Sequence, residues 1–225
     1  MAERSSISRR GVLGITLSAV AISVVELKRA SAAPVELALP ETTPAERWDF
    51  ETKGIDRWTV IEGEWSVEQM ADAPSGRRVL VQRAVKNAFD VIVAPLGPYT
   101  DVDVSVRFKP MSGREDASGG IVFRFTDGKY YVIRANALED NFRFYYYDKG
   151  RRQLATATVR APGLGQWHTL RAIAVGNQVQ GWLNGTLLLD QRDTRFRAGR
   201  VGLWTKADSV TAFDSLVIRG SSPPA

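Results

Sequence analysis

The sequence predicts an all-β domain built from two packed antiparallel sheets, a β-sandwich or jelly roll. Many short runs alternate between apolar and polar residues, turn dipeptides separate these runs, and no amphipathic helix longer than two turns is recognisable. A chain of 225 residues that is 44% hydrophobic and 24% charged is ordinary for a soluble globular protein. Ten or more short strands in a chain of this length suit a two-sheet sandwich.

The first 32 residues have the layout of an export signal. Arg4, Arg9 and Arg10 precede an uncharged, mostly apolar run over 11–25, and small residues at 30–32 offer a cleavage site. The paired arginines indicate the twin-arginine route. The apolar run is short for a membrane span, so an uncleaved anchor is the alternative rather than the prediction. We therefore expect a periplasmic or secreted protein with no membrane association once the signal is removed.

Composition excludes several classes of function. The chain has no cysteine and one histidine, His168, which excludes disulfide scaffolds, thiol nucleophiles and multi-histidine metal sites. Five of the 30 basic residues and two of the 25 acidic ones lie within residues 1–32, so the formal net charge falls from +5 to +2 without them. A net charge this small does not suggest a nucleic-acid partner.

The strands are expected between two loose segments. Residues 33–47 are rich in Pro, Glu, Thr and Ala and predict a linker, and residues 220–225 predict a tail. The clearest alternation covers 101–109, where valines and a phenylalanine alternate with polar residues. Turn signals occur at 127–128, 149–150, 184–185 and 198–199. The expected strands are 78–82, 101–109, 120–125, 130–136, 142–147, 167–175, 178–183, 186–190, 200–205 and 210–218.

Several long segments resemble a known family. FKPMSGRED (108–116), GGIVFRFTDGKYYVIRANALEDN (119–141), the strand start at 166–170, the Asn184-Gly185 turn and GLWTKADSVTAFDSL (202–216) follow in order. On these segments the chain resembles the concanavalin A-like domains of the 3-keto-disaccharide hydrolase-like family, also labelled family 16 glycoside hydrolase-like. The resemblance covers about residues 48–219 and implies a concanavalin A-like jelly roll of two curved antiparallel sheets. This fold carries lectins, glycan-binding modules and glycosidases alike.

The alternation within 120–147 predicts two faces of one sheet. Pairing about the Asp127-Gly128 turn is expected to place Arg124 near Val132. The side chains expected in the core are Ile121, Phe123, Phe125, Tyr131, Ile133, Ala135, Phe142, Phe144 and Tyr146. The side chains expected on the outer face are Val122, Arg124, Val132, Arg134, Asn136, Arg143, Tyr145 and Tyr147.

We interpret this outer face as a saccharide-binding groove. Aromatic rings pack on the apolar C–H faces of sugars, while Arg and Asn bond to hydroxyls or carboxylates. The arginines favour an acidic or oxidised sugar. Lys206 and Asp208 are expected at the rim of the groove. The alternatives are a solvated face whose arginines pair with neighbouring acids and, for Lys206 and Asp208, a surface salt bridge.

Ordinary family 16 catalysis is not expected. A retaining glycosidase needs two carboxyl groups about 5.5 Å apart, and the enzymes of that family carry them as Glu-x-Asp-x-x-Glu. The nearest run, at 101–105, has no glutamate. The resemblance instead implies cleavage of 3-keto glycosides by elimination, with Glu139 or Asp140 as the base and Arg134 or Arg124 polarising the carbonyl.

Three functions therefore stay open. The first is a non-catalytic, lectin-like saccharide-binding domain, the second is an enzyme acting on 3-keto glycosides, and the third is a module that binds another protein through a sheet edge. No cofactor is expected, although Glu139, Asp140 and Asn141 could hold Ca²⁺ instead of capping turns. His168 opens a strand directly after Trp167, a position that favours a structural role over a chemical one.

Overall fold

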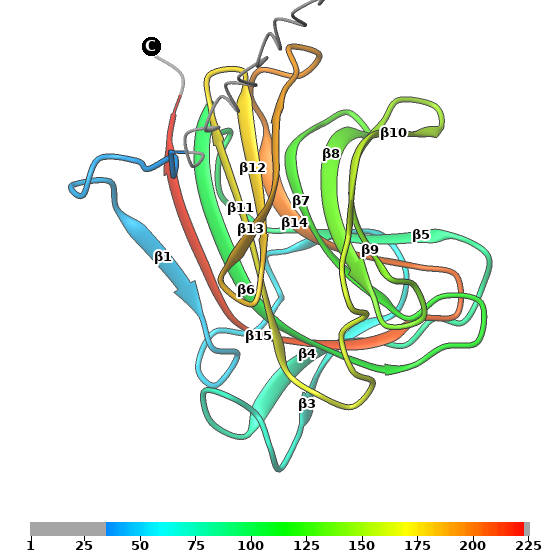
Figure 1. Ribbon diagram of the computed structural model, residues 1–225. Helices are drawn as coiled ribbons and strands as arrows, with labels where there is room; N and C mark the ends of the chain where they lie inside the picture. Colours follow the sequence, from blue (N-terminus) through cyan, green and yellow to red (C-terminus); the bar gives the residue numbers. More distant parts are fainter. Residues whose placement is uncertain (1–34, 223–225) are drawn as a thin grey trace, which may run out of the picture. The chain divides into compact units, whose positions relative to one another are not determined.

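The computed structural model describes residues 35–222, which contain fifteen β-strands and no helix. The expected export signal, residues 1–32, lies outside these residues, as does the end of the expected tail. Figure 1 shows the two layers, with β7, β8 and β9 in one and β4, β6 and β15 in the other. The strands are β1 (Ala45–Trp48), β2 (Thr59–Glu62), β3 (Trp65–Gln69), β4 (Arg78–Gln82), β5 (Phe89–Val93), β6 (Asp101–Ser112), β7 (Ser118–Thr126), β8 (Lys129–Asn136), β9 (Asn141–Tyr147), β10 (Arg151–Thr158), β11 (His168–Val175), β12 (Gln178–Leu183), β13 (Thr186–Arg192), β14 (Arg200–Lys206) and β15 (Val210–Ser221).

Both sheets are antiparallel, which confirms the predicted two-sheet sandwich. The eight-stranded sheet has the order β13-β12-β11-β6-β15-β4-β3, and β1 pairs with the second half of β15. The seven-stranded sheet has the order β10-β9-β8-β7-β14-β5-β2. All ten expected strands are present. Sequence alternation missed β1, β2, β3, β5 and β10. The first two are short and largely exposed, β3 and β10 mix exposed with half-buried positions, and β5 is buried along nearly its whole length and so does not alternate.

The core between the sheets follows the predicted alternation. Even-numbered positions of β6, from Val102 to Phe108, are buried in the core, and odd-numbered positions are half-exposed. In the seven-stranded sheet the expected core residues pack there as well, with the exception of Phe125. The core buries about thirty apolar side chains between the layers, which at about 25 cal/mol per Å² is the main source of stability.

Strand β7 departs from regular alternation at Arg124. Its backbone has φ 51, and the β7–β8 register shifts between Phe123 and Thr126. Val122 therefore pairs with Val132, and the predicted pairing of Arg124 with Val132 is wrong. A bulge inserts an extra residue and moves the following side chains to the opposite face, so Phe125 packs on the outer side of the sheet.

The expected linker is partly docked. The backbone N–H of Leu37 donates to Gln180 Oε1, and Gln180 Nε2 donates to the carbonyl of Val35, both at 2.8 Å. Glu36 pairs with Arg171 at 2.6 Å. Residues 35–37 therefore lie along the outer side of the eight-stranded sheet. Residues 35–222 contain no helix of the length and apolarity that crossing a membrane requires.

Candidate functional site

The outer side of the seven-stranded sheet is concave. Four strand spacings separate β5 from β9, about 19 Å on a flat sheet. The ring centroids of Phe89 on β5 and Tyr147 on β9 are nevertheless 5.8 Å apart. The sheet must curl toward this side for the two rings to meet. We call this surface the concave face.

An aromatic cluster fills the middle of the concave face. Tyr130 stacks on Tyr147 with ring centroids 5.1 Å apart and 6° between the planes, and Phe125 stacks on Tyr130 at 6.0 Å. Phe89 stacks on the buried Trp204 at 5.8 Å. Beneath these rings the sheet contributes buried valines. Arg151 completes the cluster from β10, with its guanidinium carbon 4.4 Å from the Tyr145 ring centroid and 5.0 Å from that of Phe89.

A hollow opens beside the aromatic cluster. It has a volume of about 420 Å³, within the range of small-ligand sites. Its walls are mostly apolar, and Glu62 and Asn87 contribute polar groups. The lining residues are Ile61, Glu62, Asn87, Ala88, Phe89, Val91, Phe125, Gly128, Tyr130 and Tyr147. The arrangement offers flat apolar surfaces with a few polar groups beside them.

A polar cluster adjoins the aromatic one. Arg134 Nη2 donates to Glu139 Oε2 at 2.7 Å and lies 3.4 Å from the Tyr145 hydroxyl, while Arg143 Nη1 donates to that hydroxyl at 3.1 Å. Asn141 Nδ2 donates to Glu139 Oε2 at 2.9 Å. Burial alone would raise the pKa of Glu139, but the hydrogen bonds from Arg134 and Asn141 outweigh it and hold this pKa below its ordinary value.

Gly120 makes room for this cluster. It lies between Arg134 on β8 and Trp204 on β14 in the register of the sheet. A Cβ at this position would lie 3.2 Å from Cβ of Arg134 and 3.1 Å from Cγ2 of Val132. The missing side chain leaves room for Arg134 and Val132 of the neighbouring strand β8. The second glycine of the Gly119-Gly120 pair thus shapes the concave face.

Unpartnered polar atoms are concentrated on the concave face. Within residues 35–222, fourteen buried side-chain nitrogen and oxygen atoms have no hydrogen-bond partner, and eight of them belong to this face. Buried polar atoms are nearly always paired in native proteins, so such a concentration requires an explanation. The eight atoms are Ser118 Oγ, Arg134 Nε and Nη1, Asn136 Nδ2, Asn141 Oδ1, Arg143 Nε, Arg151 Nη1 and Trp204 Nε1.

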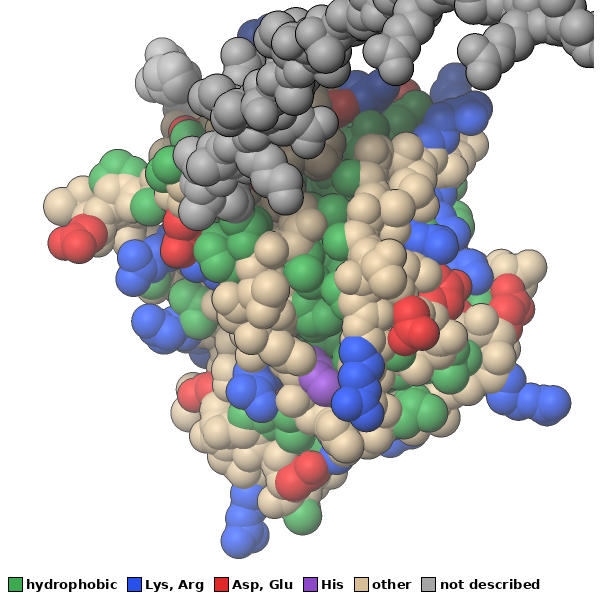
Figure 2. Space-filling view, viewed as in Figure 1, with side chains coloured by type: hydrophobic (Ala, Val, Ile, Leu, Met, Phe, Trp, Pro, Cys, Tyr) green, Lys and Arg blue, Asp and Glu red, His purple; other side chains and the backbone are tan. Residues whose placement is uncertain are grey.

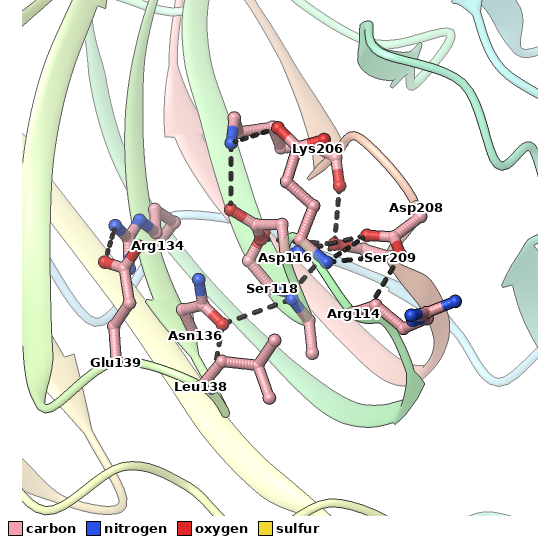
Figure 3. Close-up of polar contacts among 12 residues, drawn as sticks. Arg114, Asp116, Ser118, Arg134, Asn136, Leu138, Glu139, Lys206, Asp208 and Ser209 are labelled. Carbon is pink, nitrogen blue, oxygen red and sulfur yellow. Dashed lines mark hydrogen bonds and ion pairs between the residues drawn. The ribbon is translucent and has the colours of Figure 1, made fainter.

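A loop beside the polar cluster is held by Asp208. The Asp208 carboxylate accepts the backbone N–H groups of Arg114, Glu115 and Asp116 at 2.7 to 3.0 Å (Figure 3). Burial would raise the pKa of Asp208, but these backbone hydrogen bonds prevail and lower it. Lys206 lies 3.5 Å from the carboxylates of Glu115 and Asp116. Asp208 therefore positions the loop, and Lys206 is engaged in ion pairs.

The structure brings some predicted site residues together and separates others. Arg134, Asn136, Arg143, Tyr145 and Tyr147 lie on the concave face as expected. Arg134 and Asn136 are, however, 1% and 0% exposed, so they lie under the surface instead of lining an open groove. Asn136 Oδ1 accepts the backbone N–H groups of Ala117 and Leu138. Their role in binding stays a prediction.

Arg124 does not lie on the concave face. The bulge turns its buried side chain away from that face. The guanidinium donates at 2.7 to 3.2 Å to the carbonyls of Thr100 and Gly176, beside the ends of β6 and β11 in the other sheet, and of Phe196 in the β13–β14 connection. Desolvation lowers the pKa of Arg124. The predicted place of Arg124 in the groove is wrong, because the bulge interrupts the alternation at Arg124 itself, so its side chain does not point to the concave face.

The remaining sequence candidates occupy structural positions. Asp140 is exposed, and its Oδ1 accepts the backbone N–H of Ala161. His168 lies between Asn184 Nδ2 and the carbonyl of Gly163, at 3.1 and 3.2 Å, and packs on Phe108. No group of three or more carboxylate or imidazole side chains within residues 35–222 is placed to hold a metal ion. Calcium at the 139–141 loop, the alternative to turn capping, stays untested.

Several residues of the concave face were not predicted there, namely Phe89, Tyr130, Arg151 and Trp204, and Phe125 was expected in the core. Arg151 follows the Lys149-Gly150 turn and pairs with Tyr147, so pairing about that turn would have placed it beside the tyrosines. Phe89 and Trp204 lie on β5 and β14, whose neighbours in the sheet are distant in sequence. No local pattern brings them to the same surface.

The two antiparallel sheets and their curvature define a concanavalin A-like jelly-roll domain. The chain belongs to the 3-keto-alpha-glucoside-1,2-lyase-like domain family, which it matches over residues 47–219. No curated protein matches the sequence.

Solved structures with this fold are distant in sequence. A carbohydrate-binding module of Bacillus subtilis, CBM66, superimposes with a TM-score of 0.62 at 18% identity, over 73% of this chain and 96% of the module. A Bacillus subtilis protein of unknown function with a galectin-like fold superimposes with a TM-score of 0.60 at 13% identity, over 80% of this chain and 96% of that protein. The Bacillus licheniformis beta-glucanase superimposes with a TM-score of 0.56 at 12% identity, over 80% of this chain and 100% of the glucanase. At these identities the likeness extends to the fold alone.

Proposed function

We propose that this domain binds a saccharide on the concave face of its seven-stranded sheet. The observation that carries the proposal is the aromatic hollow of about 420 Å³, walled by Phe89, Phe125, Tyr130 and Tyr147 beside unpartnered polar groups. Flat aromatic surfaces bind the C–H faces of sugar rings, and nearby donors and acceptors select the hydroxyls. The fold shared with a carbohydrate-binding module supports this assignment.

The proposal is tested by calorimetry with neutral, acidic and 3-oxidised oligosaccharides. We expect Tyr147→Ala to weaken binding about fivefold, because a stacking ring contributes of the order of 1 kcal/mol. Trp182→Ala is the matched control, since Trp182 is a half-exposed aromatic on the eight-stranded sheet. Absence of heat with every saccharide at millimolar concentration, or equal effects of the two variants, would refute the proposal.

Family membership favours a second function, elimination from a 3-keto glycoside. In this reaction a base removes the proton next to the keto group, the electron pair forms a C=C bond, and the glycosidic C–O bond breaks as its oxygen takes up a proton. Glu139 is half-exposed beside Arg134, and its hydrogen bonds with Arg134 and Asn141 hold its pKa below the ordinary value. This pairing keeps the carboxylate available but lowers its basicity.

The elimination is tested by incubating the protein with a 3-keto disaccharide, with and without chelator, and measuring released monosaccharide. Glu139→Gln should abolish release, and Glu68→Gln, on the eight-stranded sheet, should not. Unchanged substrate with the wild-type protein removes this function and leaves saccharide binding in place.

We also propose export through the twin-arginine signal that residues 1–32 predict. A reporter fused to residues 1–40 should reach the periplasm of a host with that pathway. It should remain in the cytoplasm when Arg9 and Arg10 are both replaced by lysine. Equal export of the two fusions would contradict the assignment.

A further inference from the structure

Three guanidinium groups surround a single phenol on the concave face. Arg143 Nη1 and Arg134 Nη2 lie 3.1 and 3.4 Å from the Tyr145 hydroxyl, and Arg151 lies over the Tyr145 ring at 4.4 Å. Tyr145 itself is 4% exposed. These cations come from β8, β9 and β10, which are adjacent in the sheet. Figure 2 shows basic side chains on the side of the domain where Figure 1 places the β9–β10 hairpin.

The positive charge of this cluster is not matched by negative charge. Glu139 is the one carboxylate of residues 35–222 that pairs with the cluster, at 2.7 Å from Arg134 and 3.6 Å from Arg143. Asp116 also faces Arg143, but it is paired with Lys206 at 3.5 Å. Arg151 contacts aromatic rings and forms no ion pair within the described residues. The three arginines and Glu139 leave an excess of about two positive charges in a half-buried place.

The cluster also lacks hydrogen-bond acceptors. Nε and Nη1 of Arg134, Nε of Arg143 and Nη1 of Arg151 are buried and have no partner. Arg134 is 1% exposed, so its charge is fixed beneath the surface. By contrast, 31% of the Arg143 side chain is exposed, and Arg151 is half-exposed. A ligand can therefore reach the cluster through Arg143 and Arg151, with Arg134 acting from behind.

We propose that the saccharide bound on the concave face is anionic, and that the carboxylate of a hexuronic acid residue binds to Arg143 and Arg151. This inference rests on the proposed function. A planar carboxylate matches the fork of a guanidinium and makes charge-assisted hydrogen bonds. Neutral hydroxyl groups would supply acceptors but would leave the excess charge desolvated, which is costly. The adjoining aromatic hollow receives the rest of the sugar chain.

The test compares charged and neutral forms of the same oligosaccharides. Glucuronic, mannuronic and galacturonic acid oligomers and their carboxyl-reduced counterparts are titrated into the full-length protein by calorimetry. We expect at least one acidic oligomer to bind about tenfold more tightly than its neutral counterpart, because hydrogen bonds to charged groups exceed those to neutral ones. The preference should shrink as salt is raised from low to high concentration.

Arginine variants identify the residues responsible. Arg143→Met and Arg151→Met keep the apolar stems and should each remove the preference for the acidic form, while thermal unfolding confirms that they fold. Arg192→Met makes the same charge change on β13 of the other sheet and should leave the preference intact. Equal affinity for acidic and neutral oligomers, or a preference that survives both variants, overturns this inference and leaves the proposed function standing. Failure of every saccharide to bind removes both.

Discussion

Asp90 is a buried carboxylate whose surroundings suit its protonated form. It lies on the inner side of β5, where Oδ2 accepts hydrogen bonds from Gln82 Nε2 at 2.9 Å and from Thr205 Oγ1 at 3.2 Å. Oδ1 is buried without a partner. Burial raises the pKa of Asp90 to about 6 from 3.8, against the opposing effects of the Thr205 hydrogen bond and the Lys86 charge.

The sign of the pH dependence follows from this raised pKa. The folded protein keeps the Asp90 proton up to about pH 6, whereas the unfolded chain releases it near pH 3.8. Stability from this group is therefore complete below about pH 4 and is lost as the pH rises toward 6. A pKa rise from 3.8 to about 6 corresponds to about 3 kcal/mol. Asp90→Asn stays neutral and its Oδ1 can accept the same two hydrogen bonds, so it avoids this loss.

Urea unfolding at pH 4, 5, 6 and 7 measures the effect. The free energy of unfolding of Asp90→Asn minus that of the wild type should increase by about 2.4 kcal/mol between pH 4 and pH 7, because part of the effect is already present at pH 4. Because both proteins share all other titrating groups, the pH dependence of those groups cancels when the two free energies of unfolding are subtracted. Asp56→Asn, the same substitution at an exposed position, is the matched control. A pH-independent difference for Asp90→Asn would show that burial does not hold this proton.

Three further variants test the structural assignments. Arg124→Met leaves the carbonyls of Thr100, Gly176 and Phe196 without this donor and should cost about 3 kcal/mol in urea unfolding. A loss below about 0.5 kcal/mol would contradict the assignment. Asp208→Asn replaces an acceptor of three backbone N–H groups and should speed protease cleavage within 113–116, and an unchanged rate would show that the loop is held otherwise. Gly202→Ala places a Cβ 2.3 Å from a carbonyl oxygen of β5 and should prevent soluble expression. Gly150→Ala, where the surrounding space is open, should not. Normal yield of both variants would refute the close approach of β14 to β5 at Gly202.

Much of the fold could be predicted because alternation in a strand reports burial directly. Val102 to Phe108 and Phe142 to Tyr146 lie on the predicted sides because each strand has one face in the core and one outside. Edge strands such as β2 and β3 lack this contrast. Their positions depend on partners distant in sequence, which no local pattern reveals.

The bulge at Arg124 shows why the candidate site could be predicted only in part. Nothing in the residues around Arg124 signals an interrupted strand. A Cβ on Gly199 would lie 2.4 Å from the carbonyl carbon of Arg124, so the β13–β14 connection approaches the β7 backbone closely at this point. The interruption thus accompanies a contact between segments about 75 residues apart in sequence. The bulge exchanges the sides on which the Arg124 and Phe125 side chains lie. The concave face therefore gains the Phe125 ring and loses the Arg124 cation.

Curvature decides what the concave face can bind. On a flat sheet, Phe89 and Arg151 would be five strands apart and the face would be an open trough. The curled sheet brings them to 5.0 Å, so the protein's own side chains cover the valines and Trp204 beneath. If the proposed binding holds, we expect a saccharide to meet phenol, phenyl and guanidinium edges at the surface, so that Tyr147, Arg143 and Arg151 select its chemistry and the buried floor does not. Alternation identifies which residues lie on this side of the sheet, but only the curvature determines which of them a ligand can reach.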